Sequence, residues 1–222
     1  TYKVGDQINI TVTWNEAVLD TASRLTLSNG GEALYTNGNG TAEMVYLYVV
    51  AEGNADTTNL VVSAYTGTIT DVAGNTAGQA SGTLGAVVID ANSPILQSVN
   101  ATDKTYKVGD QVNITVTWNE PVVVTNTPTL TLSNGATASY TGGSGTTALV
   151  FRYTVVEGDT DSSDLSVSSY SGSIKDEAGN TAGIVSGDLG AVIINANSPE
   201  FQSVAAPDGS YKIGDNIAIT VT

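Results

Sequence analysis

Acidic side chains recur at the expected turns of this sequence, and they are the groups in it best suited to carry chemistry. The chain has 22 Asp and Glu residues against 7 Lys and Arg residues, a formal net charge of −15, and no Cys or His. Thiolate nucleophiles, disulfides, the usual zinc ligands and the commonest general base are therefore excluded. Carboxylate, amide and carbonyl oxygens are hard ligands, and about six to eight of them suit Ca2+. We expect these residues to hold calcium; magnesium stays open, although it needs stricter octahedral geometry and retained waters.

The same composition argues against several other classes of function. Nucleic acid and anionic membranes are disfavoured as partners because like charges repel. No stretch approaches the roughly 18 to 20 apolar residues that span a bilayer, and no signal peptide opens the chain, so we expect no membrane insertion in this segment. A pair of carboxylates is the only common catalytic arrangement left, and no unique constellation of this kind interrupts the repeat described next. We expect no enzyme activity.

The acidic positions belong to a long internal repeat. "TYKVGDQINITVTWNE" opens the chain, "TYKVGDQVNITVTWNE" begins at Thr105, and a shorter copy, "SYKIGDNIAITVT", begins at Ser210, so the period is 104 and then 105 residues. A repeat of this length matches an independent small domain. The segments "DANSP" (90–94) and "NANSP" (195–199) mark the joints, because proline forces the preceding residue into an extended conformation. We expect one module over 1–91 that lacks its first strand, a complete module over 92–196, and the first two strands of a third over 197–222, all excerpted from a longer protein.

The complete module has the pattern of an all-β domain. Apolar and polar residues alternate in "VNITVTW" (112–118), which is typical of a half-buried strand. Further strands are expected in 95–99, 129–132, 136–140, 147–156, 164–170 and 189–194, separated by Gly-, Asn- and Asp-rich turns. About seven strands at this spacing, with no helical periodicity of useful length, predict an antiparallel β-sandwich.

Alternating strand direction assigns each turn to one of the two poles of the sandwich. Asp103, Asp110, Asp159, Asp161 and Asp164 then lie at the far pole, and Glu120 and Asp176 lie at the near pole beside the joint with the preceding module. That joint also collects Asp6, Asn54 and Asp56 from the first module, together with Asp90 and Asn92 from the linker. Carboxylates about 4 Å apart repel by about 1 to 4 kcal/mol per pair, and a divalent cation reverses that sign.

Simpler interpretations of these residues stay open. Asp in "GD" and "DEAGN" is also the residue type that accepts backbone N–H bonds in turns. The 159–164 loop suits a solvated acidic loop, and Glu16 and Glu120 suit ordinary strand-end charges. Trp14 and Trp118 are expected to seal the core rather than to form carbohydrate-stacking platforms, and the aromatic residues at 46, 48, 151 and 153 are expected to point inward.

The combination "YKVGDQVNITVTWNEPV", "PTLTLSNGATASYTGGSGTTALVFRYTVVEGD", "IKDEAGN" and a terminal "NSP" resembles the tandem Ig-like extender repeats of giant bacterial surface adhesins, especially RTX adhesins exported by type I secretion. The resemblance covers essentially the whole chain. It implies tandem Ig-like β-sandwich modules arranged end to end in an extracellular stalk, with calcium at the joints keeping the stalk stiff. The chain has no glycine- and aspartate-rich nonapeptide repeats and no ligand-binding insertion, so the RTX export region and the adhesive tip are expected outside it.

The resemblance also implies ligand sets for the joints. The first joint would use Asp90, Asn92, Glu120 and Asp176, and the second Asp103, Asp110, Asp159, Asp161, Asp164, Asn195 and Asn197. Asp6, Asp56, Glu16 and Asp71 are further candidate ligands. The first module has Asn54 and Asn59 where the second has Asp159 and Asp164, and Asp90 is replaced by Asn195 at the second joint. We therefore do not expect the joints to be occupied equally.

Together these observations predict a structural spacer of a bacterial cell-surface adhesin, used in cell adhesion and biofilm formation, whose partners are the neighbouring modules of the same chain. The alternative is an Ig-like module that itself binds a glycan or a protein. A further hypothesis concerns the first module, whose missing first strand leaves an open edge. The segment "PEFQSV" in 199–204 is such a strand, and it could complete that edge in another copy of the chain.

Overall fold

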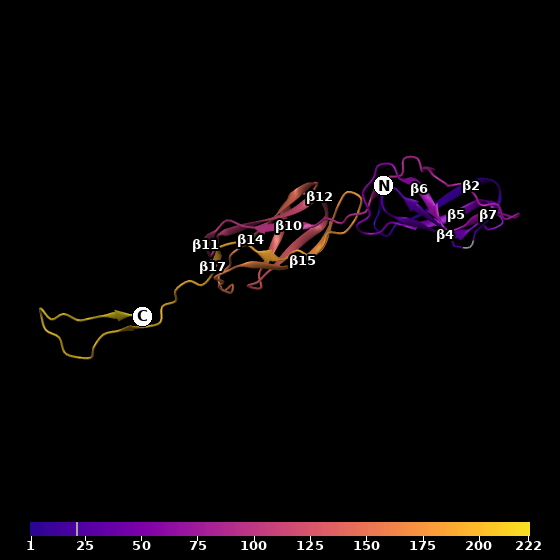
Figure 1. Ribbon diagram of the computed structural model, residues 1–222. Helices are drawn as coiled ribbons and strands as arrows, with labels where there is room; N and C mark the ends of the chain where they lie inside the picture. Colours follow the sequence, from indigo (N-terminus) through magenta and orange to yellow (C-terminus); the bar gives the residue numbers. More distant parts are fainter. Residues whose placement is uncertain (21) are drawn as a thin grey trace.

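The computed structural model describes residues 1–20 and 22–222, and it is built from strands and turns. The predicted all-β class is confirmed, because the described residues form several antiparallel sheets and no helix. No helix that could cross a membrane occurs in this part of the chain. Two hydrophobic cores share no residues: the core of the first β unit draws on residues 8–91, and that of the second β unit on residues 99–196. The two units and a C-terminal tail follow one another along the chain in Figure 1.

The first β unit is centred on a seven-stranded sheet of order β7-β2-β5-β4-β3-β6-β8. Its strands are β2 (Gln7–Asp20), β3 (Arg24–Leu27), β4 (Glu32–Asn37), β5 (Thr41–Val49), β6 (Val61–Thr66), β7 (Ile69–Asp71) and β8 (Gly82–Thr83). Ile8 and Ile10 of β2 point into the core, as do Tyr46 and Tyr48 of β5, which confirms the inward alternation expected from the sequence. β1 (Tyr2–Lys3) and β9 (Ile89–Asp90) form a separate parallel pair. In the chain, β1 precedes the strands of this sheet and β9 follows them.

The second β unit repeats this plan. Its strands are β10 (Leu96–Asn100), β11 (Lys104–Lys107), β12 (Gln111–Leu132), β13 (Thr137–Gly142), β14 (Thr146–Thr154), β15 (Ser166–Lys175), β16 (Gly187–Asp188) and β17 (Val192–Asn195). Their order is β13-β14-β12-β15-β16, with β10 paired to β12 and with β11 and β17 forming a separate parallel pair. Trp118, Phe151 and Tyr153 are buried in its core, as predicted.

Two features of the second unit differ from the predicted strands. The segments expected as separate strands at 112–118 and 129–132 belong to the single strand β12, which changes register between Thr117 and Val122 and again between Thr125 and Thr129. Pro121 and Pro128 lie in these gaps, where a residue without an N–H interrupts no ladder bond. Residues 104–107 were expected in a turn and instead form β11, which runs parallel to β17. Strand direction therefore does not alternate throughout.

The C-terminal tail contains one short antiparallel pair. β18 (Val204–Ala205) pairs with β19 (Thr220–Val221), and every residue from 197 to 222 is exposed. Neither strand contributes to a hydrophobic core among the described residues.

Candidate metal centre at the joint

Three carboxylates meet where the two β units join. Asp90 ends β9 of the first unit, Glu120 lies within β12, and Asp176 follows the last residue of β15. Each offers an oxygen atom, and these atoms lie within 4.8 Å of one another. Asp176 is buried, with 4% of its surface exposed, whereas Asp90 and Glu120 are half-buried. The group is therefore assembled from both units and exists only while they are held together.

Local turn chemistry positions Asp176. Its Oδ1 accepts hydrogen bonds from the backbone N–H groups of Gly179 (2.6 Å) and Asn180 (2.8 Å), and its own N–H donates to the carbonyl of Asn180 (3.1 Å). Asp and Asn close turns in this way, so the hydrogen-bonding role expected for "DEAGN" is confirmed. The turn leaves Oδ2 of Asp176 to face the joint, where it accepts a bond from the Asn180 amide at 2.7 Å.

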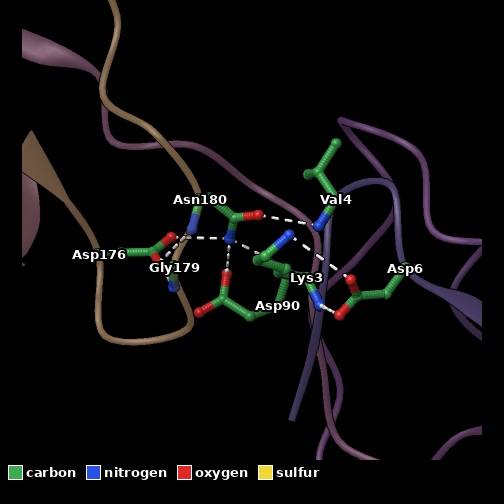
Figure 2. A network of polar contacts seen from close by, with 7 residues as sticks. All are labelled: Lys3, Val4, Asp6, Asp90, Asp176, Gly179 and Asn180. Carbon is green, nitrogen blue, oxygen red and sulfur yellow. Dashed lines mark hydrogen bonds and ion pairs between the residues drawn. The ribbon is translucent and has the colours of Figure 1, made fainter. Parts of the chain in front are cut away.

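Asn180 connects this turn to the first unit (Figure 2). Its side-chain oxygen accepts the backbone N–H of Val4 at 2.8 Å, and its Nδ2 donates to the backbone carbonyl of Asp90 at 3.1 Å. Only 3% of its surface is exposed. The strand count placed Asp176 of the same "DEAGN" turn at this pole, but it gave Asn180 no role between the units. Its position in "AGN" directly after the Asp176 turn is the signal that could have indicated one.

Two acids of the first unit, Asp56 and Glu52, fix the linker after Asp90. Oδ1 of Asp56 accepts the backbone N–H of Ala91 and the side-chain amide of Asn92, each at 2.8 Å. Glu52 accepts the N–H of Ser93 at 2.9 Å and its hydroxyl at 2.7 Å. Asp56 and Asn92, both predicted as ligands, are thus engaged in ordering the linker that carries Asp90.

A second set of contacts holds the start of β10 against β12. The N–H of Asn119 donates to the carbonyl of Ile95 at 3.0 Å, and its side-chain oxygen accepts the N–H of Ile95 at 2.7 Å. Asn119 directly precedes Glu120, so the same contacts that dock the linker fix the strand segment that carries this carboxylate.

The electrostatics of the group favour a bound cation. Burial, followed by repulsion from Asp176 and Asp56, raises the pKa of Asp90 above its ordinary value. Burial also raises the pKa of Glu120, with repulsion from Asp176 and Asp90 as the next causes. None of the three ion pairs in the described chain involves these carboxylates. A hard divalent cation would relieve the repulsion, and the all-oxygen donor set fits Ca2+.

The joint is open to solvent at Asp90. An open hollow of about 800 Å³ is lined by Asp56, Asp90 and Glu177, among other residues. A hydrated cation could approach the three carboxylates through this acidic hollow, whose negative potential would raise its local concentration.

The other predicted site residues lie outside this group of three carboxylates, although Asp6 belongs to the polar network at the joint through Lys3 (Figure 2). Asp6 and Asp110 each accept a backbone N–H within their "GD" turns, from Lys3 and Lys107, which is the hydrogen-bonding role of the simpler interpretation. Metal ligation by these two acids stays a prediction. Asp71 accepts the N–H of Asn75 at 2.8 Å, and it lines a hollow at the outer pole of the first unit together with Glu16.

The acids predicted for the second joint have separate partners. Asp103 accepts the N–H of Ala191, and Asp159 accepts a bond from the Tyr153 hydroxyl. Asp161 accepts the N–H of Ala196 and the side-chain amide of Asn197. Asn195 lies opposite Lys107 in the β11–β17 pair, and the N–H of Asp164 donates to the hydroxyl of Ser162. In the part of the chain that the structure describes, only Asp90, Glu120 and Asp176 gather three such groups within 4.8 Å. Ligation at the second joint stays a prediction.

The linker contacts nevertheless recur at the second joint. Glu157 accepts the N–H and hydroxyl of Ser198 at 2.8 and 2.7 Å, as Glu52 does with Ser93. Asp161 holds Ala196 and Asn197 as Asp56 holds Ala91 and Asn92. The two joints therefore share one way of ordering the linker, and they differ in the acids brought to it.

No protein-family model matches this chain. No curated protein sequence matches it either. The geometry of the joint and the pattern of the repeat therefore have to support any functional assignment.

Proposed function

We propose that this chain is part of the extender stalk of a bacterial cell-surface adhesin, in which tandem Ig-like β-sandwich modules are stiffened by Ca2+ at their joints and project a distal adhesive domain. The observation that supports the proposal best is the convergence of Asp90 from the first unit with Glu120 and Asp176 from the second. A cation held by this group would bridge the two units. The resemblance of the repeat to adhesin extender modules supplies the extracellular location and the role in cell adhesion.

The mechanism is a linkage between cation binding and the arrangement of the joint. A cation that binds the ordered joint and not a flexible one stabilises the ordered state by RT ln(1 + [Ca]/Kd), about 0.4 kcal/mol when the free concentration equals Kd and about 1.4 kcal/mol when it is about ten times Kd. Extracellular modules bind calcium with Kd values of about 0.1 to 1 mM, so millimolar calcium outside the cell would occupy even a weak site. Binding and stiffness would then change together.

Direct contacts between the units set what calcium has to add. Asn180 of the second unit accepts the N–H of Val4 and donates to the carbonyl of Asp90, both in the first unit. Glu52 accepts the N–H of Ser93 in the linker, and none of these hydrogen bonds requires a cation. These few hydrogen bonds oppose the repulsion among three carboxylates. Calcium would convert the repulsive element into an attractive one, so the joint is expected to bend more freely when calcium is removed, while each β unit keeps its own core.

Small-angle scattering of the 222-residue chain in calcium and in chelator tests this proposal. We expect chelation to broaden the distribution of inter-unit distances while circular dichroism keeps its β-sheet signal. Glu120→Gln should make the scattering profile respond much less to calcium than that of the wild type. Glu16→Gln is the matched control, because Glu16 is the equivalent residue at the outer pole, away from the joint. A scattering profile that is the same with and without calcium would overturn the calcium-stiffened stalk.

A further inference from the structure

Two turns from neighbouring units meet directly at the joint (Figure 2). One is "KVGD" (3–6) of the first unit, and the other is "DEAGN" (176–180) of the second. The backbone N–H of Val4 donates to Oδ1 of Asn180 at 2.8 Å, and the stem of the Lys3 side chain lies beside Gly179. The turns therefore touch each other without using any carboxylate of the candidate metal centre.

The KVGD turn is closed by its own hydrogen bonds. Asp6 accepts the N–H of Lys3 at 3.0 Å, and its own N–H donates to the carbonyl of Lys3 at 3.0 Å. Asp110 and Lys107 make the same two bonds in the second unit, at 3.3 and 2.9 Å. Because the two copies agree, the local sequence sets the shape of the turn. The N–H of Val4 takes no part in closing it and donates to the neighbouring unit instead.

The DEAGN turn is preformed in the same way. The N–H of Asn180 donates to Oδ1 of Asp176, and the N–H of Asn75 donates to Oδ1 of Asp71 in the first unit, each at 2.8 Å. Both side-chain amides also donate to the second carboxylate oxygen, at 2.7 Å. That bond orients the amide of Asn180 with its oxygen toward Val4. Two rigid turns lose little conformational freedom when they meet, so even a small contact between them can be net favourable.

Gly179 and Gly74 occupy the same position of this turn in different surroundings. Their φ values are similar, +101° and +93°, so both positions favour glycine for the backbone. A Cβ added to Gly179 would lie 3.3 Å from Cδ of Lys3, whereas a Cβ added to Gly74 would have no atom of the described residues within 4 Å. Only Gly179 therefore also allows a neighbouring unit to approach closely.

We infer that the KVGD turn of one unit and the DEAGN turn of the next form a docking contact that holds the units in one orientation without a cation. Val4 supplies a backbone donor for Asn180, and Lys3 supplies an aliphatic stem for the space left by Gly179. The first unit has the related turn "DVAGN" (71–75), and the second unit has its own "KVGD" (107–110). Each unit thus carries both partners of the contact, so the same contact can recur from joint to joint in a tandem array.

The contact also positions the metal centre, a step that rests on the proposed function. Asn180 donates to the carbonyl of Asp90 at 3.1 Å and to Oδ2 of Asp176 at 2.7 Å, so one buried amide links two of the three acidic residues. When Val4 fixes this amide, Asp90 and Asp176 stay close before any cation arrives. Such pre-assembly lowers the conformational cost of binding, so docking and calcium should strengthen each other.

Hydrogen exchange of backbone amides in the 222-residue chain, followed by NMR in chelator, tests the docking contact. We expect the N–H of Val4 to be protected without calcium, because its acceptor Asn180 is buried. Gly179→Ala should speed this exchange about two- to tenfold, the effect of one lost hydrogen bond. Gly74→Ala is the matched control, because it adds the same methyl group at a similar φ and away from the joint, and it should leave the exchange of Val4 unchanged.

A Lys3→Ala background separates docking from strain within the turn. The Lys3 side chain is 40% exposed, so this variant should fold. With the stem removed, Gly179→Ala should change the exchange of Val4 much less than it does in the wild type. An equal effect in both backgrounds would reveal strain within the turn and overturn the inference. A Val4 N–H that exchanges in chelator as fast as in the unfolded chain would overturn it as well.

Calorimetric titration of the same variants tests the positioning role. Gly179→Ala replaces no predicted ligand, yet it should weaken calcium binding by a similar factor, whereas Gly74→Ala should not. Unchanged affinity in Gly179→Ala would contradict that role. Absence of calcium binding in the wild type would contradict the proposed function and leave the exchange results in chelator as expected. Loss of Val4 protection in chelator, with calcium binding intact, would overturn the docking contact alone.

Discussion

Replacing Glu120 with Gln should change the stability of the joint in opposite directions with and without calcium. The substitution keeps the shape of the side chain and removes one of three carboxylates whose oxygen atoms lie within 4.8 Å of one another. At that separation, two unit charges interact by about 0.9 kcal/mol in the dielectric of water and by about 3.5 kcal/mol at an effective dielectric of 20. Glu120 is half-buried and has two such neighbours, so we expect Glu120→Gln to stabilise the chelated protein by about 1 to 2 kcal/mol.

The sign reverses when calcium is present. Losing one charged ligand weakens the site, and each tenfold loss of affinity removes about 1.4 kcal/mol of linked stabilisation when calcium is in excess. Denaturant unfolding of the wild type, Glu120→Gln and Glu16→Gln, each in chelator and in millimolar calcium, measures both effects. Glu16→Gln should respond to calcium as the wild type does. A Glu120→Gln variant that is shifted in the same direction and by the same amount in both conditions would refute the reasoning, because it would show a structural effect independent of charge and cation.

The remaining predictions concern the same joint and the packing of β10 in the second unit. Burial raises the pKa values of Asp90 and Glu120 in the folded joint without calcium, so their contribution to stability is fully present below their ordinary pKa values and is lost as pH rises through the raised ones. In chelator, the stability of the wild type relative to Glu120→Gln should therefore fall as pH rises above about 4, and a constant difference would contradict this. Asn180→Ala removes the acceptor of the Val4 N–H and a buried donor to Asp90, and it should cost about 1 to 3 kcal/mol by denaturant unfolding. Asn75→Ala, its counterpart at the outer pole, should cost less because the Asn75 side chain bonds to Asp71 of its own turn. Equal losses in the two variants would contradict a bridging role for Asn180. Gly187→Ala should destabilise the second unit by about 1 to 3 kcal/mol because its methyl group meets Val99, and Gly82→Ala should be close to neutral in this 222-residue chain. Thermal unfolding of both variants checks this contrast, which equal shifts would contradict.

Much of the joint could be predicted from the sequence because it follows from the order of strands and turns. The repeat fixed which residues are equivalent, and the count of strand directions brought Glu120 and Asp176 to the end of the second unit that faces Asp90. The period-two alternation in 112–118 likewise predicted the buried face of β12. These properties depend on local pattern and chain connectivity, which a single sequence records directly.

The contacts between distant segments could not be predicted in the same way. The parallel pairing of β11 with β17 joins residues far apart in the chain, and the short segment 104–107 has no pattern that distinguishes it from a turn. The bridging role of Asn180 depends on the position of the backbone N–H of Val4, and a backbone donor leaves no signature in residue types. Of the acids predicted for the second joint, Asp103, Asp159 and Asp161 accept hydrogen bonds from Ala191, Tyr153 and Ala196, and their ligation of calcium stays a prediction. Composition indicates which ligands are available, whereas the backbone decides which of them meet.

Calorimetric titration of calcium into the 222-residue chain tests the central claim most directly. We expect saturable binding in which one site is lost in Glu120→Gln and retained in Glu16→Gln, because only Glu120 lies with Asp90 and Asp176 between the two units. Absence of calcium binding, or the same stoichiometry and affinity in Glu120→Gln as in the wild type, would contradict a calcium-held joint.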